Sequence, residues 1–180
     1  MIKKILLIAS CLFLCVSFAT AQSEPSTETQ RAEMKKLEQM IGQWKGTGWM
    51  QQGAKRETFA GTENVQKKLN GLALLVEGRF TSKIPPTNEE KVIHETLAVL
   101  SYDVKKKGYR FSTYLANGNA GEQELKLVEG GWQWGPEFPG GSIRYITKMS
   151  ENIWFEIGEI TQDGGKTWRK FFEMELQRVK

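Results

Sequence analysis

The feature of this 180-residue sequence that most limits its fold is a long succession of short, strand-like segments that starts after Gly42. These segments are rich in β-branched and aromatic residues or alternate apolar with polar residues, and turn-forming residues separate them. The connections leave no room for crossover helices, so consecutive strands must pair in antiparallel fashion. We expect strands at 43–51, 56–66, 72–82, 91–102, 108–115, 121–128, 130–135, 142–149, 152–161 and 166–178.

Ten meandering strands in one small domain are most economically arranged as a closed sheet, because closure removes the exposed edges. The sequence therefore predicts an all-β fold, an up-and-down antiparallel barrel of about ten strands, which is wide enough to hold one small ligand. The longer connections, 64–71 and 82–90, are expected to be loops at the mouth of the barrel. Residues 28–41 show helical spacing of apolar residues before Gly42, which predicts one short N-terminal helix.

The amino terminus reads as a secretory signal peptide. Lys3 and Lys4 precede an apolar stretch over residues 5–18, and Ala21 is the expected last residue before cleavage. A competing reading takes Cys11 as the lipidated residue of a lipobox, but the apolar core would then be only residues 5–10. We expect export to the periplasm or the extracellular space, with a signal peptide at 1–21, a flexible leader at 22–29 and a barrel domain at 30–180.

Removal of the signal peptide changes what the composition allows. Both cysteines, Cys11 and Cys15, leave with it, which excludes cysteine chemistry and disulfides from the mature chain. The loss of Lys3 and Lys4 leaves 23 basic and 21 acidic residues, a net charge of +2, which does not favour nucleic-acid binding. No other segment is apolar enough to span a membrane, so we expect a soluble mature protein of unspecified oligomeric state.

The opening of the first predicted strand, Gly42-Gln43-Trp44-Lys45-Gly46-Thr47-Gly48, matches a known pattern. It resembles the Gly-x-Trp-x-Gly opening of calycin barrels, the superfamily of lipocalins and fatty-acid-binding proteins. With its second glycine it is also similar to nitrobindin-like haem-binding barrels. Physical reasons alone explain much of the motif, since Trp44 can plug one end of a barrel while Gly46 and Gly48 let a bent strand pass close to its neighbours.

A resemblance to the DUF1579 family of exported bacterial barrels covers more of the chain. Its matching pieces are Leu37 with the Gly42-x-Trp44-x-Gly46 motif, Leu69-Asn70-Gly71, Leu100-Ser101-Tyr102-Asp103 followed by Tyr109, and 163–168, which reads Asp-Gly-Gly-Lys-Thr-Trp. This resemblance implies an exported barrel domain.

The nitrobindin-like resemblance does not carry over a haem ligand. Those barrels bind iron through a histidine late in the chain, whereas the only histidine here is His94. Haem binding would need His94, a tyrosine or a methionine as an unusual axial ligand. We therefore predict no cofactor.

Other catalytic chemistries also lack their usual residues. No Gly-x-Ser-x-Gly sequence positions a nucleophile, and one histidine without mature cysteines does not supply a zinc or copper site, so no metal site is expected. His94 could act as a base near neutral pH, but alternation along a strand places His94 and Glu95 on opposite faces. The segment 161–168 resembles the Asp-box of sialidases, which stabilises a hairpin and is not catalytic.

Arginines and aromatic residues on the predicted strands are the best candidates for ligand contacts. An arginine that points into a barrel would suit an acidic head group, and aromatic walls bind apolar rings and tails, although outward arginines and core-filling aromatics remain the alternatives. The candidate ligand-binding residues are Trp49, Arg79, His94, Arg110, Tyr114, Trp132, Trp134, Arg144 and Trp154.

The function predicted from these features is non-enzymatic binding of a small hydrophobic or amphipathic molecule, such as a lipid. Two alternatives stay open. The first is an envelope interaction protein with a filled barrel, which contacts a partner through Pro85-Pro86 or Phe138-Pro139, and the second is an isomerase or cyclase that depends on His94.

Overall fold

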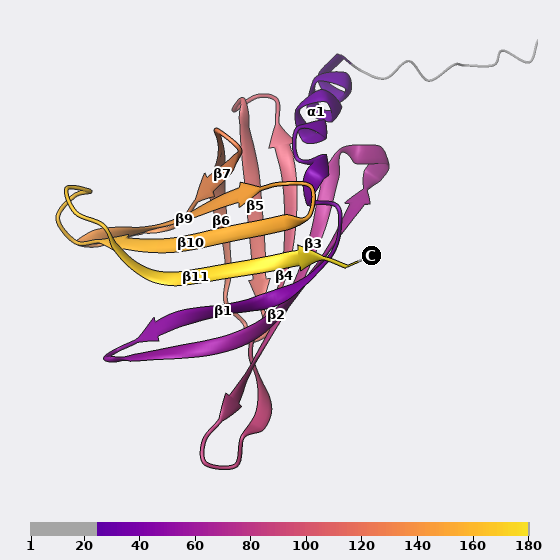
Figure 1. The fold of residues 1–180 in the computed structure, drawn as a ribbon. Coiled ribbons are helices and arrows are strands. Elements are labelled where there is room, and N and C mark those ends of the chain that lie inside the picture. The colour runs from indigo at the N-terminus through magenta and orange to yellow at the C-terminus, as the bar shows by residue number, and fades with distance from the viewer. Residues whose placement is uncertain (1–24, 180) are drawn as a thin grey trace, which may run out of the picture.

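The computed structural model describes residues 25–179 of the chain, so the expected signal peptide and the first residues of the leader lie outside the described residues. The described residues form one helix, two short 3-10 turns and eleven strands, whose arrangement is drawn in Figure 1. They are α1 (Pro25–Lys35), η1 (Glu38–Met40), β1 (Gly42–Gln52), β2 (Lys55–Lys68), η2 (Leu69–Gly71), β3 (Ala73–Ile84), β4 (Glu89–Asp103), β5 (Gly108–Leu115), β6 (Ala120–Val128), β7 (Gly131–Trp134), β8 (Glu137–Phe138), β9 (Gly141–Met149), β10 (Ile153–Thr161) and β11 (Arg169–Arg178).

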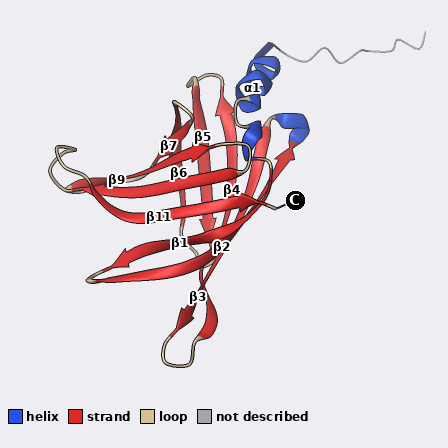
Figure 2. Ribbon diagram, in the orientation of Figure 1, coloured by secondary structure: helices blue, strands red, loops and turns tan. Residues whose placement is uncertain are grey.

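The strands form a closed antiparallel barrel, as the sequence predicted. The strand order is β10-β11-β1-β2-β3-β4-β5-β6-β7-β9, and pairing of β9 with β10 closes the sheet. Ten strands build the wall, and the two-residue β8 pairs only with the start of β9. Every neighbouring pair of wall strands is antiparallel, so the barrel is of the up-and-down type (Figure 2).

Alternating burial along the strands determines which side chains face the interior. On β2, Phe59, Gly61, Glu63 and Val65 are buried while the residues that alternate with them are more exposed. The same parity places Trp44 inside on β1, with its ring edge-to-face against Trp154 of β10 at 5.8 Å. Close approach of strands requires glycine at Gly46, because a Cβ there would lie 2.8 Å from the Cα of Leu176.

The N-terminal helix covers one end of the barrel (Figure 1). Met34, Leu37 and Met40 are almost fully buried there, and the Tyr109 hydroxyl of β5 donates to a carboxylate oxygen of Glu33 at 2.8 Å. Trp44 donates from its indole nitrogen to the carbonyl of Met40 at 2.8 Å. The end where β1 begins is therefore closed by side chains.

The carboxyl-terminal strand fastens this closed end. Arg178 donates to the carbonyls of Ile41 and Gln39 at 2.6 and 2.8 Å, and its guanidinium lies 4.0 Å from the centre of the Trp44 ring. A cation over an indole face adds an electrostatic attraction to these hydrogen bonds. The first and last strands are thus joined by side chains as well as by backbone pairing.

Several boundaries differ from the sequence prediction. The helix α1 begins at Pro25, so residues 25–29 are helical and not part of a leader, because proline suits the first turn of a helix. The expected loop at 64–71 is mostly strand, since β2 continues to Lys68 with Val65 buried inside the barrel. Likewise β3 and β4 extend into the expected loop at 82–90 and leave only four residues between them.

Candidate ligand-binding cavity

The barrel interior contains a cavity of about 470 Å³, whose lining includes Met40 of η1. Most of its lining is apolar, and the exposed residues Ile93 and His94 of β4 stand at its mouth. The lining side chains come from nearly every wall strand and from η1: Met40, Met50, Gln52, Phe59, Glu63, Val76, Phe80, Ile93, His94, Thr96, Ala98, Leu100, Phe111, Thr113, Leu115, Gln123, Leu125, Trp132, Trp134, Pro136, Tyr145, Trp154, Glu156, Phe172 and Met174.

One wall of the cavity is a continuous aromatic surface. Trp134 stacks on Tyr145 with ring centres 4.5 Å apart, and Phe111 meets Trp134 edge-to-face at 4.8 Å. Trp132 and Trp154 meet edge-to-face deeper in the barrel at 5.7 Å. Rings held in this way offer rigid apolar contact area to a ligand.

Glu63 is a buried carboxyl group on the wall of this cavity. Its side chain is 8% exposed and projects from β2 over Gly78 of β3. A Cβ at position 78 would lie 2.7 Å from a carboxylate oxygen of Glu63, so this glycine leaves the space that the carboxyl group occupies. One oxygen of Glu63, Oε2, is buried and has no hydrogen-bond partner. Burial, together with the charge of Glu156, raises the pKa of Glu63 to about 8.

Glu156 is the second buried carboxyl group, and it comes from β10. Its oxygen Oε2 accepts a hydrogen bond of 2.5 Å from the hydroxyl of Thr147 on the neighbouring strand. Burial raises the pKa of Glu156 to about 7, although Thr147 and the nearby indole groups of Trp154 and Trp134 favour the charged form. The indole nitrogen of Trp154 is itself buried and completes no hydrogen bond.

His94 lies at the mouth and not beside an obvious catalytic partner. Its ring is 5.6 Å from the ring of Phe80, and partial burial lowers the pKa of His94. Glu95 faces the opposite side of β4, where it approaches Arg79, as alternation along the strand predicted. The acidic interior of the cavity also does not suit the propionate groups of a haem, and the late strands β9 to β11 contain no histidine.

The nine candidate residues divide between the two faces of the barrel wall. The structure brings four of them together around the cavity: His94, Trp132, Trp134 and Trp154. The remaining five lie on the outer face: Trp49, Arg79, Arg110, Tyr114 and Arg144.

Each of the three arginines has a carboxylate partner outside the barrel. Arg110 pairs with Glu122 at 2.7 Å, and Arg144 pairs with Glu159 at 2.7 Å and lies over the ring of Trp168. Arg79 approaches Glu95 at 3.9 Å. None of them lines the cavity, so an inward arginine does not provide a site for an acidic head group.

Sequence reasoning missed the two buried carboxyl groups. A signal was present, because Trp44 fixes the inward parity of β1 and the register carries that parity to Glu63 and, through β11, to Glu156. Without the pairing register, a glutamate on a strand is predicted to face outward into solvent.

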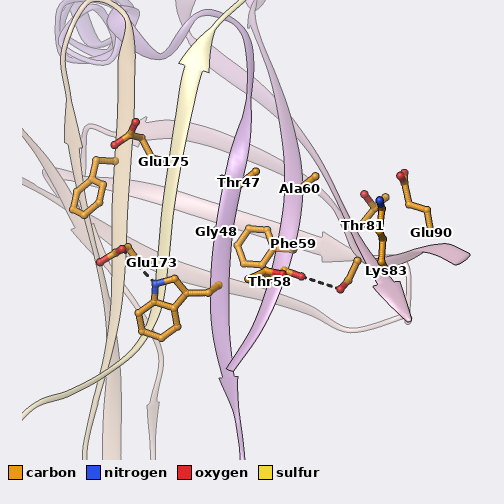
Figure 3. A pocket seen from close by; sticks show the side chains of 13 residues that line it. Thr47, Gly48, Thr58, Phe59, Ala60, Thr81, Lys83, Glu90, Glu173 and Glu175 are labelled. Carbon is orange, nitrogen blue, oxygen red and sulfur yellow. Dashed lines mark hydrogen bonds between the residues drawn. The ribbon is translucent and has the colours of Figure 1, made fainter. Parts of the chain in front are cut away.

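A second hollow of about 620 Å³ lies on the outer side of β1, β2 and β11 (Figure 3). Three of its polar side chains, Trp49, Glu173 and Ser82, have partners. The Trp49 indole donates to Glu173 at 3.3 Å, Lys170 pairs with Glu173 at 2.6 Å, and Ser82 donates to the carbonyl of Thr58 at 2.8 Å. This outer groove is thus an open surface on which Trp49, Glu173 and Ser82 already have partners.

The remaining features concern metal binding and membrane helices. Among residues 25–179, no group of histidine, cysteine and carboxylate side chains has the arrangement of a metal site. In the same range no helix has both the length and the apolar character needed to cross a bilayer.

Comparison with known proteins identifies the fold but no family. A scan against protein-family models found no match, which leaves the resemblance to DUF1579 without support. A search of curated proteins also found no match.

Solved structures include barrels similar to this one. The crystal structure of Rv2717c from M. tuberculosis matches with a TM-score of 0.58 and 9% identity, covering 87% of this chain and 99% of that chain. The S-type phycobiliprotein lyase CPES from Guillardia theta matches with a TM-score of 0.55 and 13% identity, covering 88% of this chain and 98% of that chain. These similarities show that the closed barrel fold recurs in known structures, and identities this low carry no function over.

Proposed function

We propose that this protein binds a small amphipathic molecule inside its barrel without changing it chemically. The observation that carries the proposal is the interior cavity of about 470 Å³, which combines an aromatic wall with two buried polar groups, Glu63 and Glu156. Ligand pockets in proteins are typically apolar cavities with a few well-placed polar groups. The expected export signal would make this an extracytoplasmic binding protein.

The cavity favours an amphipathic ligand over a wholly apolar one. An apolar body fits against Trp134 and Tyr145, where burial of apolar surface contributes roughly 25 cal/mol per Å². The unpartnered oxygen of Glu63 and the unpartnered indole nitrogen of Trp154 each carry a desolvation cost that a polar ligand group can remove. An interior with such space also weighs against a filled scaffold that acts only through its surface.

The test is binding of an uncharged apolar dye, Nile red, to the protein and to two matched variants. Thr96 lines the cavity, whereas its neighbour Leu97 is 40% exposed on the outer face of the same strand. We expect Thr96→Trp to weaken dye binding at least tenfold by filling the cavity. Leu97→Trp should bind the dye as the parent protein does.

Equal dye affinity in both tryptophan variants would contradict an interior site. Native mass spectrometry of the protein purified from its own cell envelope provides a second readout, since a tightly held ligand adds its mass to the chain. That added mass should be absent from Thr96→Trp and present in Leu97→Trp.

A further inference from the structure

Two acidic side chains face one apolar cavity that holds no basic partner for them. Glu63 projects from β2 and Glu156 from β10, and each is at least nine-tenths buried. Among the described residues that line the cavity there is no lysine and no arginine. Buried carboxyl groups without a cation are costly, because desolvation disfavours their charged forms.

The protein supplies cations on the outside of the barrel instead. Arg110 and Arg144 each lie 2.7 Å from a carboxylate oxygen of their outer-face partners. The chain therefore matches opposite charges where water already screens them and leaves the buried pair unmatched. This distribution points to a positive charge that arrives from outside the chain.

Burial disfavours the charged form of both groups, whereas hydrogen-bond donors beside Glu156 favour it. Thr147 donates to Glu156 at 2.5 Å, and the buried indole nitrogen of Trp154 has no hydrogen-bond partner. Glu63 has an oxygen with no partner at all, and the lack of a side chain at Gly78 gives its carboxyl group room. These are two independent, unsatisfied polar groups directed at the same cavity.

The aromatic wall suits a cation as well. Phe111 and Tyr145 each pack against Trp134, with ring centres 4.8 and 4.5 Å from its own. The faces of such rings carry partial negative charge and attract ammonium groups, most strongly where water is excluded.

We infer that the ligand of this cavity carries an organic ammonium group, which Glu63 and Glu156 hold while its apolar body lies against the aromatic wall. The inference rests on the proposed binding function and names the class of ligand. The only bonds that break are the carboxyl O–H bonds of those Glu63 and Glu156 groups that are protonated: their protons pass to the buffer, and the ammonium group binds the resulting carboxylates.

Other titratable groups around the pair do not obscure this proton release. Tyr145 of β9 has its pKa raised to about 12 by burial, so it stays neutral near pH 7. His94 of β4 has a lowered pKa, so it too is neutral above pH 7. Tyr109 at the closed end has its pKa raised by burial and by Glu33. Glu63 and Glu156 are thus the cavity groups that change charge near neutral pH.

The experiment is calorimetric titration with three probes of similar shape: phenethylamine, 2-phenylethanol and 3-phenylpropionate. We expect phenethylamine to bind at least tenfold more tightly than the alcohol, and the carboxylate to bind most weakly. Repeating the amine titration at pH 7 in buffers of different ionisation enthalpy should reveal protons released on binding. The alcohol should release none.

Matched variants test which carboxyl groups hold the ammonium group. Glu63→Gln and Glu156→Gln should each weaken amine binding at least tenfold and leave alcohol binding within about twofold. Glu175→Gln removes the same charge from the exposed outer face of β11 and should bind all three probes as the parent does. Thermal melts of all variants confirm that they are folded.

The outcomes separate the two proposals. If the alcohol or the carboxylate binds the parent as tightly as the amine, or if both glutamine variants keep full amine affinity, the ammonium inference is wrong while the binding function stands. If none of the three probes nor Nile red binds the folded parent protein, the binding function fails and the inference fails with it.

Discussion

The interior cavity and the outer groove are hollows of similar size whose polar groups differ in their exposure to water. The outer groove is larger, about 620 Å³ against about 470 Å³, yet it is open to solvent, and its Glu173 already pairs with Trp49 and Lys170. In the cavity, Glu63 Oε2 and Trp154 Nε1 are buried without partners. A polar group in water loses little when it is unpaired, whereas a buried one loses its solvation, so unsatisfied groups identify the binding site better than volume does.

The largest expected effect compares two tryptophans on β1 that face opposite sides of the wall. Trp44 is 1% exposed and packs between Trp154 and Arg178, while Trp49 is half-buried beneath Arg56, whose guanidinium lies 3.6 Å from its ring centre. We expect Trp44→Ala to lower the free energy of unfolding by about 3–5 kcal/mol, because it leaves a void in the core. Trp49→Ala should cost only about 1 kcal/mol.

Urea unfolding of both variants measures this difference. Trp44→Phe serves as the control, since it keeps most of the buried volume and loses only the hydrogen bond to Met40 and part of the ring contact. Equal losses for the two alanine variants would mean that the outer groove stabilises the barrel as much as its plugged end does.

The next effect concerns pH and the buried carboxyl pair. A carboxyl group whose pKa is higher in the folded than in the unfolded state stabilises the fold fully below the unfolded value, and that contribution is lost as pH rises through the folded value. Burial raises the pKa of Glu63 from 4.5 to about 8 and that of Glu156 to about 7. The unliganded protein should therefore lose roughly 1–2 kcal/mol of stability between about pH 7 and pH 9.

Glu63→Gln should remove most of this loss, and Glu175→Gln should leave it unchanged. The window above pH 7 avoids His94, whose lowered pKa makes stability rise with pH at lower values. Urea unfolding at several pH values tests the prediction. A stability that is constant or increases from pH 7 to 9 in the parent would show that Glu63 is not protonated in the folded protein.

Fold and site differ in how far the sequence predicts them. The antiparallel barrel could be predicted because strand-like segments and turn residues are local signals, and no segment after Gly42 could form a crossover helix. Strand ends were less predictable where a polar run continues a strand, as in 64–68, because register and not composition extends the pairing. The start of α1 at Pro25 was not predicted, because it lies in a polar segment that resembles a flexible leader.

Prediction of the site would have required knowledge of which face of each strand points into the barrel. Alternation along a strand divides residues into two sets but does not say which set is buried. For Trp132 and Trp134 bulk alone suggested the interior, whereas Arg79, Arg110 and Arg144 could have faced either way and lie outside. Glu63 and Glu156 needed the full register around the barrel, which is a non-local property.

The smallest expected effect concerns the turn between β10 and β11, which belongs to neither hollow. Asp163 accepts hydrogen bonds from Thr167 Oγ1 at 2.6 Å, Thr167 N at 3.0 Å and Thr161 Oγ1 at 2.8 Å, and these lower the pKa of Asp163 to about 2. The stabilisation is present above the unfolded pKa and is lost as pH falls through about 2.

We expect Asp163→Asn to raise the rate of protease cleavage within 162–168 severalfold at neutral pH, with Nile red binding unchanged. Asn117→Ser, in the turn between β5 and β6, is the control and should leave cleavage at 162–168 unchanged. Weaker dye binding in Asp163→Asn would show that this turn helps to shape the cavity, and the separation between interior and outer face would then need revision.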